Sequence, residues 1–258
     1  FCSSISTNTF SQSSNQAGST IQTRFSPPEG YARQPLTGFQ FYLRNLPLKE
    51  PSATVHYYNG EEKRNQVHAA VLDVDVGTRD LQQCADAIMR LKAEYLYSTK
   101  QFDKIHFNFT NGFRCDYSEW MKGKRTRVDG NKVRWVQKYQ PSNTYKDFRN
   151  YLTIIFSYAG TLSLAKELNS VAINDLQIGD VFIQGGSPGH AILVVDVAID
   201  PATQEKVFLL AQSYMPAQDI HILKNFGAME MSPWYEIPKN GVLDTPEWVF
   251  GVKDLKRF

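Results

Sequence analysis

The clearest indication of a reactive site in this sequence is a histidine at the start of a long apolar run. His190 opens the run 191–195, and the small residues 185–189 come directly before it. A glycine-rich approach lets other backbone, or a ligand, come close to the imidazole. An imidazole placed in this way can take up and return a proton near neutral pH. His190 is therefore a candidate general base.

Three consecutive apolar runs predict the strands that position this histidine. Pro201 lies in the link between the second and third runs, and a hairpin there sets His190 roughly opposite Gln212 or Ser213. A slip of one residue in the register exchanges which of the two shares the face of the histidine, so the choice between them stays open. Each run is bounded by turn formers, as expected for buried strands, and they cover residues 179–183, 189–196 and 207–213.

A thiol is the nucleophile that such a histidine would activate. Cys84 falls in the first turns of a helix predicted from about residue 80 to 97. There the helix dipole and free backbone N–H groups lower a thiol pKa and can hold an oxyanion. Gln82 and Gln83 precede it, and either amide would add a donor. Cys84 also lies on the apolar stripe of the helix, where a small thiol packs in a core, so both interpretations stay open.

Cys115 is the alternative nucleophile. It follows the strand-ending pair 111–112 and precedes a predicted helical turn. The adjacent Asp116 opposes thiolate formation, because a nearby negative charge raises the pKa of a thiol. Cys84 and Cys115 are also the one pair within the predicted folded part that a disulfide would join.

Two aspartates near the strands have simpler interpretations. Asp180 follows Gly179 at the entry to a strand, and we expect its carboxylate to accept hydrogen bonds from nearby backbone amides. Asp196 lies within the buried histidine strand, where we expect it to be paired. The 5 histidines and 3 cysteines show no metal-ligand spacing, so neither a metal nor a cofactor is expected.

Length and charge limit the class of protein. With 258 residues and 42% apolar content, the chain can build one sizeable core. A formal net charge of +2 with interspersed signs argues against a nucleic-acid partner, and the basic run 122–127 is interpreted as a solvated hairpin edge. No stretch reaches the roughly 20 apolar residues of a membrane span.

The N-terminal residues differ in composition from the rest. Residues 1–24 are rich in Ser, Thr, Asn and Gln, which predicts a disordered polar tail before a single domain over residues 25–258. Such a start is typical of a processed secretory precursor, so export to the periplasm or cell surface is expected. A lipid anchor at Cys2 stays open.

The elements predicted for residues 25–258 give an α+β fold in which residues 101–140 form an inserted hairpin region. One helix, near residue 80, is expected to have Thr78 or Asp80 as its N-cap. Helices are predicted at 39–46, 80–97, 116–121 and 145–168, and strands at 54–58, 67–76, 105–110, 125–128, 132–136, 220–223 and 248–252.

The predicted site resembles the second half of papain-like cysteine hydrolases, in particular the NlpC-type and amidase-type peptidases of bacterial cell walls. The resemblance rests on Gly-Asp-Val-Phe at 179–182, on His190 opening an apolar strand, and on Gln212 in the next strand. It implies a cysteine at a helix N-terminus packed against a small antiparallel sheet that carries the histidine and a third, orienting residue. The chain order Cys84 or Cys115, then His190, then Gln212 agrees with that pattern.

Over its whole length the chain also resembles an uncharacterised family of exported bacterial proteins, known as a domain of unknown function. The segments 80–87, 185–191 and 210–218 carry this resemblance. It implies a protein of the bacterial envelope.

Two functional hypotheses follow. In the first, the protein hydrolyses an amide bond in a peptide or peptidoglycan-like substrate: Cys84 attacks, His190 acts as base and then as acid, and Gln212 orients the imidazole, with Gln82, Gln83, Ser213 and Asp180 in support. In the second, a non-catalytic envelope protein with the same fold binds glycan or peptide through its aromatic side chains. The candidates for that contact are Tyr57, Tyr58, Trp120 and Trp135.

Overall fold

The largest element of the fold is an antiparallel sheet of eight strands. The structure, a computed structural model, describes residues 18–258. The strand order is β1-β10-β9-β8-β7-β14-β6. Strand β10 pairs with the C-terminal end of β9, and the eighth strand, β11, pairs with the N-terminal end of β9. The strands are β1 (His68–Val71), β6 (Asn169–Ser170), β7 (Val181–Gln184), β8 (His190–Ile199), β9 (Lys206–Gln212), β10 (His221–Leu223), β11 (Tyr235–Glu236) and β14 (Leu255–Arg257).

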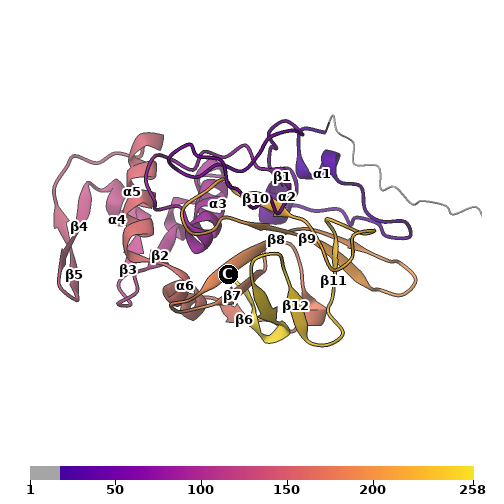
Figure 1. The fold of residues 1–258 in the computed structure, drawn as a ribbon. Helices are drawn as coiled ribbons and strands as arrows, with labels where there is room; N and C mark the ends of the chain where they lie inside the picture. Colours follow the sequence, from indigo (N-terminus) through magenta and orange to yellow (C-terminus); the bar gives the residue numbers. More distant parts are fainter. Residues whose placement is uncertain (1–17) are drawn as a thin grey trace, which may run out of the picture.

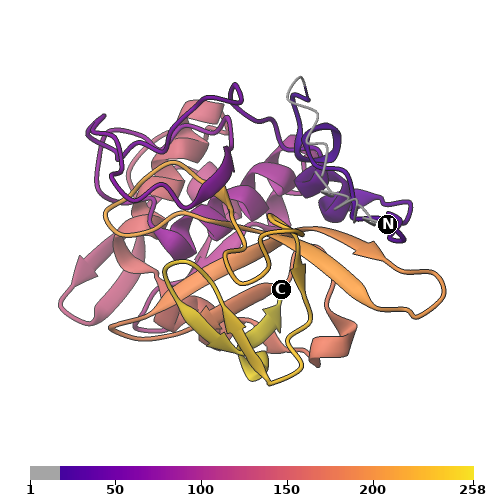
Figure 2. The same ribbon diagram turned by 45° about the vertical axis from the view of Figure 1, so that its right-hand side comes forward.

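The centre of this sheet is the part that the sequence predicted. The strands expected at 179–183, 189–196, 207–213 and 220–223 are confirmed as β7, β8, β9 and β10. Every residue of β8 except the last is buried. Helices cover one face of the sheet and C-terminal strands the other, as Figures 1 and 2 show, which explains why β8 is apolar on both of its faces.

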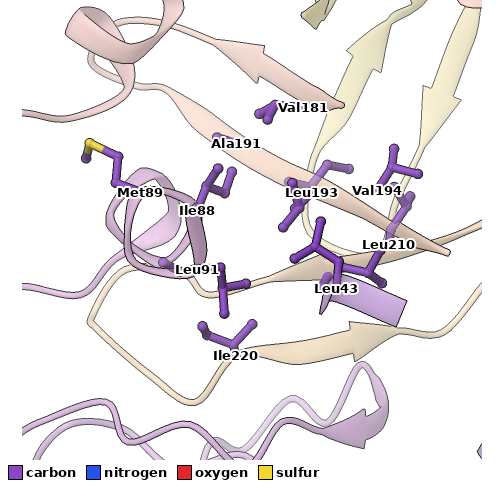
Figure 3. Close-up of a cluster of buried hydrophobic side chains, with 14 of the residues drawn as sticks. Leu43, Ile88, Met89, Leu91, Val181, Ala191, Leu193, Val194, Leu210 and Ile220 are labelled. Atoms are coloured by element: carbon purple, nitrogen blue, oxygen red, sulfur yellow. The ribbon is translucent and has the colours of Figure 1, made fainter. Parts of the chain in front are cut away.

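Two helices from the first half of the chain pack on the sheet. Helix α3 (Cys84–Ser98) lies against β8, and α2 (Gly38–Arg44) packs on the same strand and on α3. Figure 3 shows Ile88 and Leu91 of α3 beside Leu193 of β8, with Leu43 of α2 completing the cluster. Burial of these side chains, each about 2 kcal/mol, holds α3 against β8.

A group of shorter elements lies between α3 and the sheet strands in the chain. It comprises the two-stranded sheet β2 (His106–Asn108) and β3 (Arg114–Asp116), helix α4 (Tyr117–Met121), and the hairpin β4 (Lys124–Asp129) and β5 (Lys132–Gln137). Figure 1 shows the hairpin projecting at the left. The predicted hairpin of strands 125–128 and 132–136 and the helical turn at 116–121 are confirmed.

The single helix predicted over 145–168 is wrong. The chain instead forms α5 (Tyr145–Tyr158) and α6 (Thr161–Glu167), with Ala159 and Gly160 extended between them. The carbonyl of Tyr158 accepts the backbone N–H of Thr110 at 2.8 Å, and the backbone N–H of Gly160 donates to Ser163 Oγ at 3.0 Å. Tertiary contact and a new cap thus outweigh a continuous helical pattern.

Two strands predicted before α3 are also different in the structure. Residues 54–58 form no strand; His56 and Tyr57 make only isolated bridges, to Glu62 and Gln218. The strand predicted over 67–76 is limited to β1, which ends at Val71. Beyond it Asp75 turns to ion pairs with Arg90 and Arg149, so the polar residues leave the sheet.

The C-terminal residues contain more strands than were predicted. Besides β11 and β14, residues 232–258 form a two-stranded sheet of β12 (Val242–Asp244) and β13 (Val249–Gly251), the second at the place predicted for 248–252. Strand β14 lies between β7 and β6 in the main sheet. Its Arg257 donates to both carboxylate oxygens of Asp180, at 2.6 and 2.8 Å, which fastens the end of the chain to the start of β7.

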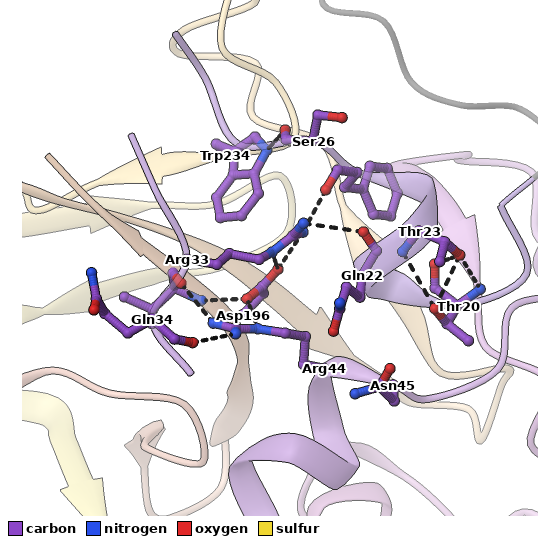
Figure 4. Close-up of polar contacts among 12 residues, drawn as sticks. Thr20, Gln22, Thr23, Ser26, Arg33, Gln34, Arg44, Asn45, Asp196 and Trp234 are labelled. Atoms are coloured by element: carbon purple, nitrogen blue, oxygen red, sulfur yellow. Dashed lines mark hydrogen bonds and ion pairs between the residues drawn. The ribbon is translucent and has the colours of Figure 1, made fainter. Parts of the chain in front are cut away.

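The structure differs from the predicted N-terminal tail at residues 21–24, which form the short helix α1 (Ile21–Arg24) with Ile21 fully buried. Nearby, Asp196 of β8 has no exposed side-chain area and pairs with Arg33 and Arg44, each at 2.6 Å, which confirms its expected pairing. Figure 4 shows these groups together. Helix α2 and the segment between α1 and α2 are thereby joined to the sheet. Cys2 lies outside the described residues.

Candidate functional site

Cys84 is the first residue of α3. Gln83 is the N-cap, and its backbone N–H donates to Asp86 Oδ2 at 3.1 Å. The prediction of Thr78 or Asp80 as the cap is wrong. Asp80 Oδ1 instead accepts the backbone N–H of Ala217 at 2.7 Å and so fixes the loop beyond β9 to the start of the helix.

The Cys84 thiol is half-buried, and its pKa is raised to about 11. Burial is the main cause and the carboxylate of Asp86 adds to it. The nearby backbone N–H groups of Ala85, Ala191 and Cys84 itself act in the opposite direction and lower the pKa. The helix start therefore lowers the pKa as expected, but burial outweighs it. At neutral pH the thiol keeps its proton.

His190 is the first residue of β8, where it pairs with Gln184 of β7, and it is 1% exposed. Its Nε2 lies 2.8 Å from Gln212 Oε1. Burial lowers the pKa of His190 to about 4; the hydrogen bond to Gln212 opposes this and the charge of Lys63 adds to it. The imidazole is therefore neutral at pH 7 and can accept a proton.

The register of β8 and β9 decides between the two orienting residues. Leu193 pairs with Ala211, which places Gln212 on the face of His190 and Ser213 on the other face. Ser213 Oγ donates to the carbonyl oxygens of Gln82 at 3.1 Å and Gln218 at 2.8 Å. Gln212 is therefore the partner of the imidazole, and Ser213 ties the end of β9 to the residues before Cys84.

Aromatic rings surround the imidazole. Ring centroids lie 4.6 Å away for Tyr214, 5.5 Å for Trp248 and 5.9 Å for Phe250. These rings keep water from the bond between His190 and Gln212, which strengthens that bond electrostatically.

The glycines before His190 meet α6 closely. A Cβ at Gly189 would lie 2.6 Å from the Gly186 carbonyl oxygen and 2.7 Å from Thr161 Oγ1, and one at Gly185 would lie 2.9 Å from the Ala165 side chain. The small residues here are therefore required by backbone packing. The sequence predicted that backbone or a ligand comes close to residues 185–189, and in the structure the groups that do so are the protein's own backbone and helix α6.

Helix α3, which begins at Cys84, packs against β8, which begins at His190. The backbone N–H of Ala191, the residue after His190, lowers the pKa of the Cys84 thiol, which places the sulfur near the start of β8. Within residues 18–258 no hydrogen bond joins the thiol to the imidazole directly. Because His190 Nε2 is held by Gln212, Nδ1 is the ring nitrogen that has no hydrogen-bond partner among the described residues.

Comparison with protein-family models gives one match, a family described as "Domain of unknown function (4846)", over residues 21–257. The chain belongs to this family. The matched range includes Cys84, His190 and Gln212, together with the strands and helices that position them. Comparison with curated proteins and with solved structures found no match.

Cys115, the alternative nucleophile, does not lie near His190 in the fold but in the small sheet of β2 and β3. Cys115 is fully buried in β3, opposite Phe107 of β2, and its carbonyl accepts the Tyr151 hydroxyl at 2.7 Å. Burial, and then the Asp116 carboxylate, raise the pKa of the Cys115 thiol. Cys84 and Cys115 are both free, so the disulfide left open between them is absent from the described residues.

The predicted supporting residues make hydrogen bonds to groups other than the thiol. Gln82 accepts from Arg90 at 2.8 Å and donates to the Asp75 carbonyl, and Gln83 Nε2 donates to Asp80 at 2.9 Å, so both amides are already engaged. Asp180 accepts the Gln177 backbone N–H at 2.9 Å, the local bond that was expected. Asp180 lies directly before the first residue of β7, whereas Gln184, which pairs with His190, is the last residue of that strand.

The structure leaves fewer of the aromatic residues that were predicted to contact glycan or peptide exposed. Trp120 is 4% exposed and stacks under the Arg125 guanidinium at 3.8 Å, so the interpretation of Trp120 as a surface contact is wrong. Trp135 packs against Phe113 with centroids 5.8 Å apart. Tyr57 and Tyr58 are half-buried.

Three further polar residues form a network with the Gln212 side chain and were not predicted from the sequence. Glu247 Oε2 accepts from Gln212 Nε2 at 2.6 Å and from Lys63 Nζ at 2.6 Å, and His221 Nε2 lies 3.3 Å from the same Gln212 nitrogen. They come from three distant segments, so no spacing in the sequence connects them. The one local signal is a histidine in an apolar strand, which His221 shares with His68 and His106.

Among residues 18–258, no helix combines the length and the apolar character that crossing a membrane requires. Within the same residues, no three His, Cys, Asp or Glu side chains come together as a set of metal ligands.

Proposed function

We propose that the protein is a cysteine hydrolase that cleaves an amide bond with Cys84, His190 and Gln212. The observation that carries the proposal is the 2.8 Å hydrogen bond from His190 Nε2 to Gln212 Oε1, made on the strand against which the thiol-bearing helix α3 packs. A thiol, an imidazole and an orienting amide in this order form a complete unit for nucleophilic catalysis.

In the proposed reaction, His190 Nδ1 takes the proton of Cys84 as the sulfur attacks the carbonyl carbon of the substrate. The backbone N–H groups at the start of α3 stabilise the oxyanion. His190 then gives its proton to the leaving amine, which departs and leaves a thioester on Cys84. Water, deprotonated by the same imidazole, releases the carboxylic acid and restores the thiol.

The resting pKa values support general-base assistance over a stored ion pair. The thiol titrates near pH 11 and the imidazole near pH 4. At pH 7 both groups are neutral, so proton transfer must accompany the attack on substrate. Hydrogen bonds between catalytic groups often tighten only when substrate is bound, which is consistent with a thiol and imidazole that are not yet bonded.

A peptide or peptidoglycan-like substrate, and a location in the cell envelope, are part of the proposal. They are supported by the resemblance to NlpC-type and amidase-type peptidases. The competing proposal is a binding protein that uses the same fold without catalysis, and the raised pKa of the Cys84 thiol is the observation in its favour.

The first test is hydrolysis of peptidoglycan fragments, analysed by mass spectrometry for new amine and carboxyl ends. We expect Cys84→Ala to abolish cleavage, and Cys115→Ala to retain it if the protein folds. Cleavage that survives in Cys84→Ala would contradict the assignment. Binding of fragments without cleavage by the unaltered chain would favour the binding protein.

A further inference from the structure

The side chain that orients His190 is itself held by a second set of polar groups, His221, Glu247 and Lys63. Among them, His221 is fully buried in β10. Its Nδ1 lies 2.9 Å from the carbonyl oxygen of Asp219, which can only accept, so Nδ1 carries the proton. Burial lowers the pKa of His221 to about 3, and the ring is neutral at pH 7. Its Nε2 is consequently an acceptor.

This acceptor and the Glu247 carboxylate both face one end of the Gln212 amide. Gln212 is 2% exposed. The atom that lies 2.6 Å from Glu247 Oε2 and 3.3 Å from His221 Nε2 must be the amide nitrogen, because both neighbours accept. The oxygen end therefore points to His190. Two independent acceptors thus determine the orientation of the amide.

The orientation of the amide determines the tautomer of His190. An amide oxygen at 2.8 Å requires the proton on His190 Nε2, which leaves the lone pair on Nδ1. If the amide were turned over, its nitrogen would donate to Nε2 and the ring proton would move to Nδ1. The imidazole could not then accept the thiol proton, because its free lone pair would face Gln212.

Lys63 fixes the carboxylate in place. It is 4% exposed, and its Nζ donates to Glu247 Oε2 at 2.6 Å, the oxygen that also receives Gln212. Lys63 lies in the loop before β1, whereas Glu247 lies between β12 and β13. Two segments that are far apart in the chain thus meet behind the strand that carries Gln212.

We propose that Glu247 and His221 are positioning residues that orient the Gln212 amide and thereby keep His190 as the Nε2–H tautomer. The inference rests on the proposed function for its consequence, since the tautomer matters only if Nδ1 accepts the proton of Cys84. Lys63 serves the same unit by holding Glu247. Glu247 is the stronger determinant, because its bond to the amide is shorter and charge-assisted.

The experiment measures two quantities separately on the full chain, the tautomer of His190 and the reactivity of the Cys84 thiol. Long-range ¹H–¹⁵N correlation spectra of ¹⁵N-histidine-labelled protein distinguish Nε2–H from Nδ1–H, with His190→Gln to assign the signal. The rate at which chloroacetamide labels Cys84 at pH 7 gives the second readout. The variants are Glu247→Ala and Glu247→Gln, whose amide oxygen can still accept, with the surface substitution Glu119→Gln as a matched control.

We expect His190 in the unaltered chain and in Glu247→Gln to be the Nε2–H tautomer. In Glu247→Ala we expect a mixture of tautomers and a labelling rate at least about tenfold lower. The inference is overturned if the unaltered chain has the Nδ1–H tautomer, or if Glu247→Ala matches it in both readouts. A loss in Glu247→Gln as large as in Glu247→Ala would also overturn it.

Glu247→Ala leaves the Lys63 ammonium buried without its carboxylate, which can prevent folding. The double variant Lys63→Met, Glu247→Leu removes the pair together and is expected to show the same mixture of tautomers; a single Nε2–H form there would overturn the inference. The two readouts also separate the proposals. An Nε2–H tautomer that depends on Glu247, together with Cys84 labelling that ignores His190, would support the positioning unit and contradict the hydrolase.

Discussion

At the scale of single residues, the acid closest to the thiol in the chain is in an unfavourable position. Asp86 is 6% exposed, its Oδ2 accepts the Gln83 N–H, and its Oδ1 has no partner among the described residues. Burial raises the pKa of Asp86 well above its ordinary value. The carboxylate form costs stability, and it also raises the pKa of Cys84.

We therefore predict that Asp86→Asn stabilises the protein at neutral pH, because it removes a buried carboxyl group whose ionised form is unfavourable there. The pKa of Asp86 is higher in the folded state than in the unfolded chain, so stability is lost as pH rises from the ordinary aspartate value through the raised one. The amide keeps an acceptor for Gln83 without the charge. Urea unfolding at pH 7 should show the gain, and a loss of stability there would contradict the prediction.

At the scale of elements, the loop between β7 and β8 decides where the imidazole lies. Gly189 has no room for a side chain, because a Cβ would lie within 2.8 Å of three atoms of Gly186, Thr161 and Gln184. Two of those atoms are backbone carbonyl oxygens, which cannot move without shifting the strand. The start of β8 is thus set by contact with the start of α6.

Gly189→Ala is predicted to destabilise the protein by about 1–3 kcal/mol and to slow labelling of Cys84, since it displaces His190. The matched control is Gly160→Ala, because a Cβ at Gly160 meets no atom within 4 Å and its backbone is extended. Thermal unfolding and the labelling rate measure the two effects. Equal behaviour of the two variants would show that the contact at Gly189 is not important.

The central strands could be predicted from the sequence because each is an apolar run between turn formers. The β4–β5 hairpin was predictable for a similar, local reason. Helix 145–168 was not, since its break depends on the bond from Thr110 to the Tyr158 carbonyl. For the candidate site, Cys84, His190 and the pair Gln212 or Ser213 were predicted from local patterns, and the register of β8 and β9 then places Gln212 on the face of His190. Glu247 could not be predicted, because only the folded chain brings it to Gln212.

At the scale of the whole molecule, buried ion pairs join distant segments to the sheet. Asp196, with no exposed side-chain area, accepts from Arg33 at 2.8 and 2.6 Å and from Arg44 at 2.6 Å. At the other side of the sheet, Asp180 and Arg257 connect β7 to the last strand. The sheet that carries His190 therefore depends on both ends of the described chain.

Asp196→Ala is predicted to cost about 3–5 kcal/mol, because two guanidinium groups would stay largely buried without a carboxylate. Asp129→Ala, at the exposed tip of the β4–β5 hairpin, is the control and should change stability by less than about 0.5 kcal/mol. Denaturant unfolding measures both. A cost for Asp196→Ala as small as for the control would mean that the ion pairs are not required.

The measurement that tests the central claim most directly is the pH dependence of Cys84 labelling by chloroacetamide, followed by peptide mapping, in the unaltered chain and in His190→Ala. If neutral His190 is the base, the rate should rise as pH passes about 4, the pKa of His190, and then stay level through neutral pH. His190→Ala should be slower at pH 7 and rise about tenfold per pH unit towards the thiol pKa near 11. A tenfold rise per unit in both proteins, at the same rate, would contradict an activated cysteine and histidine pair.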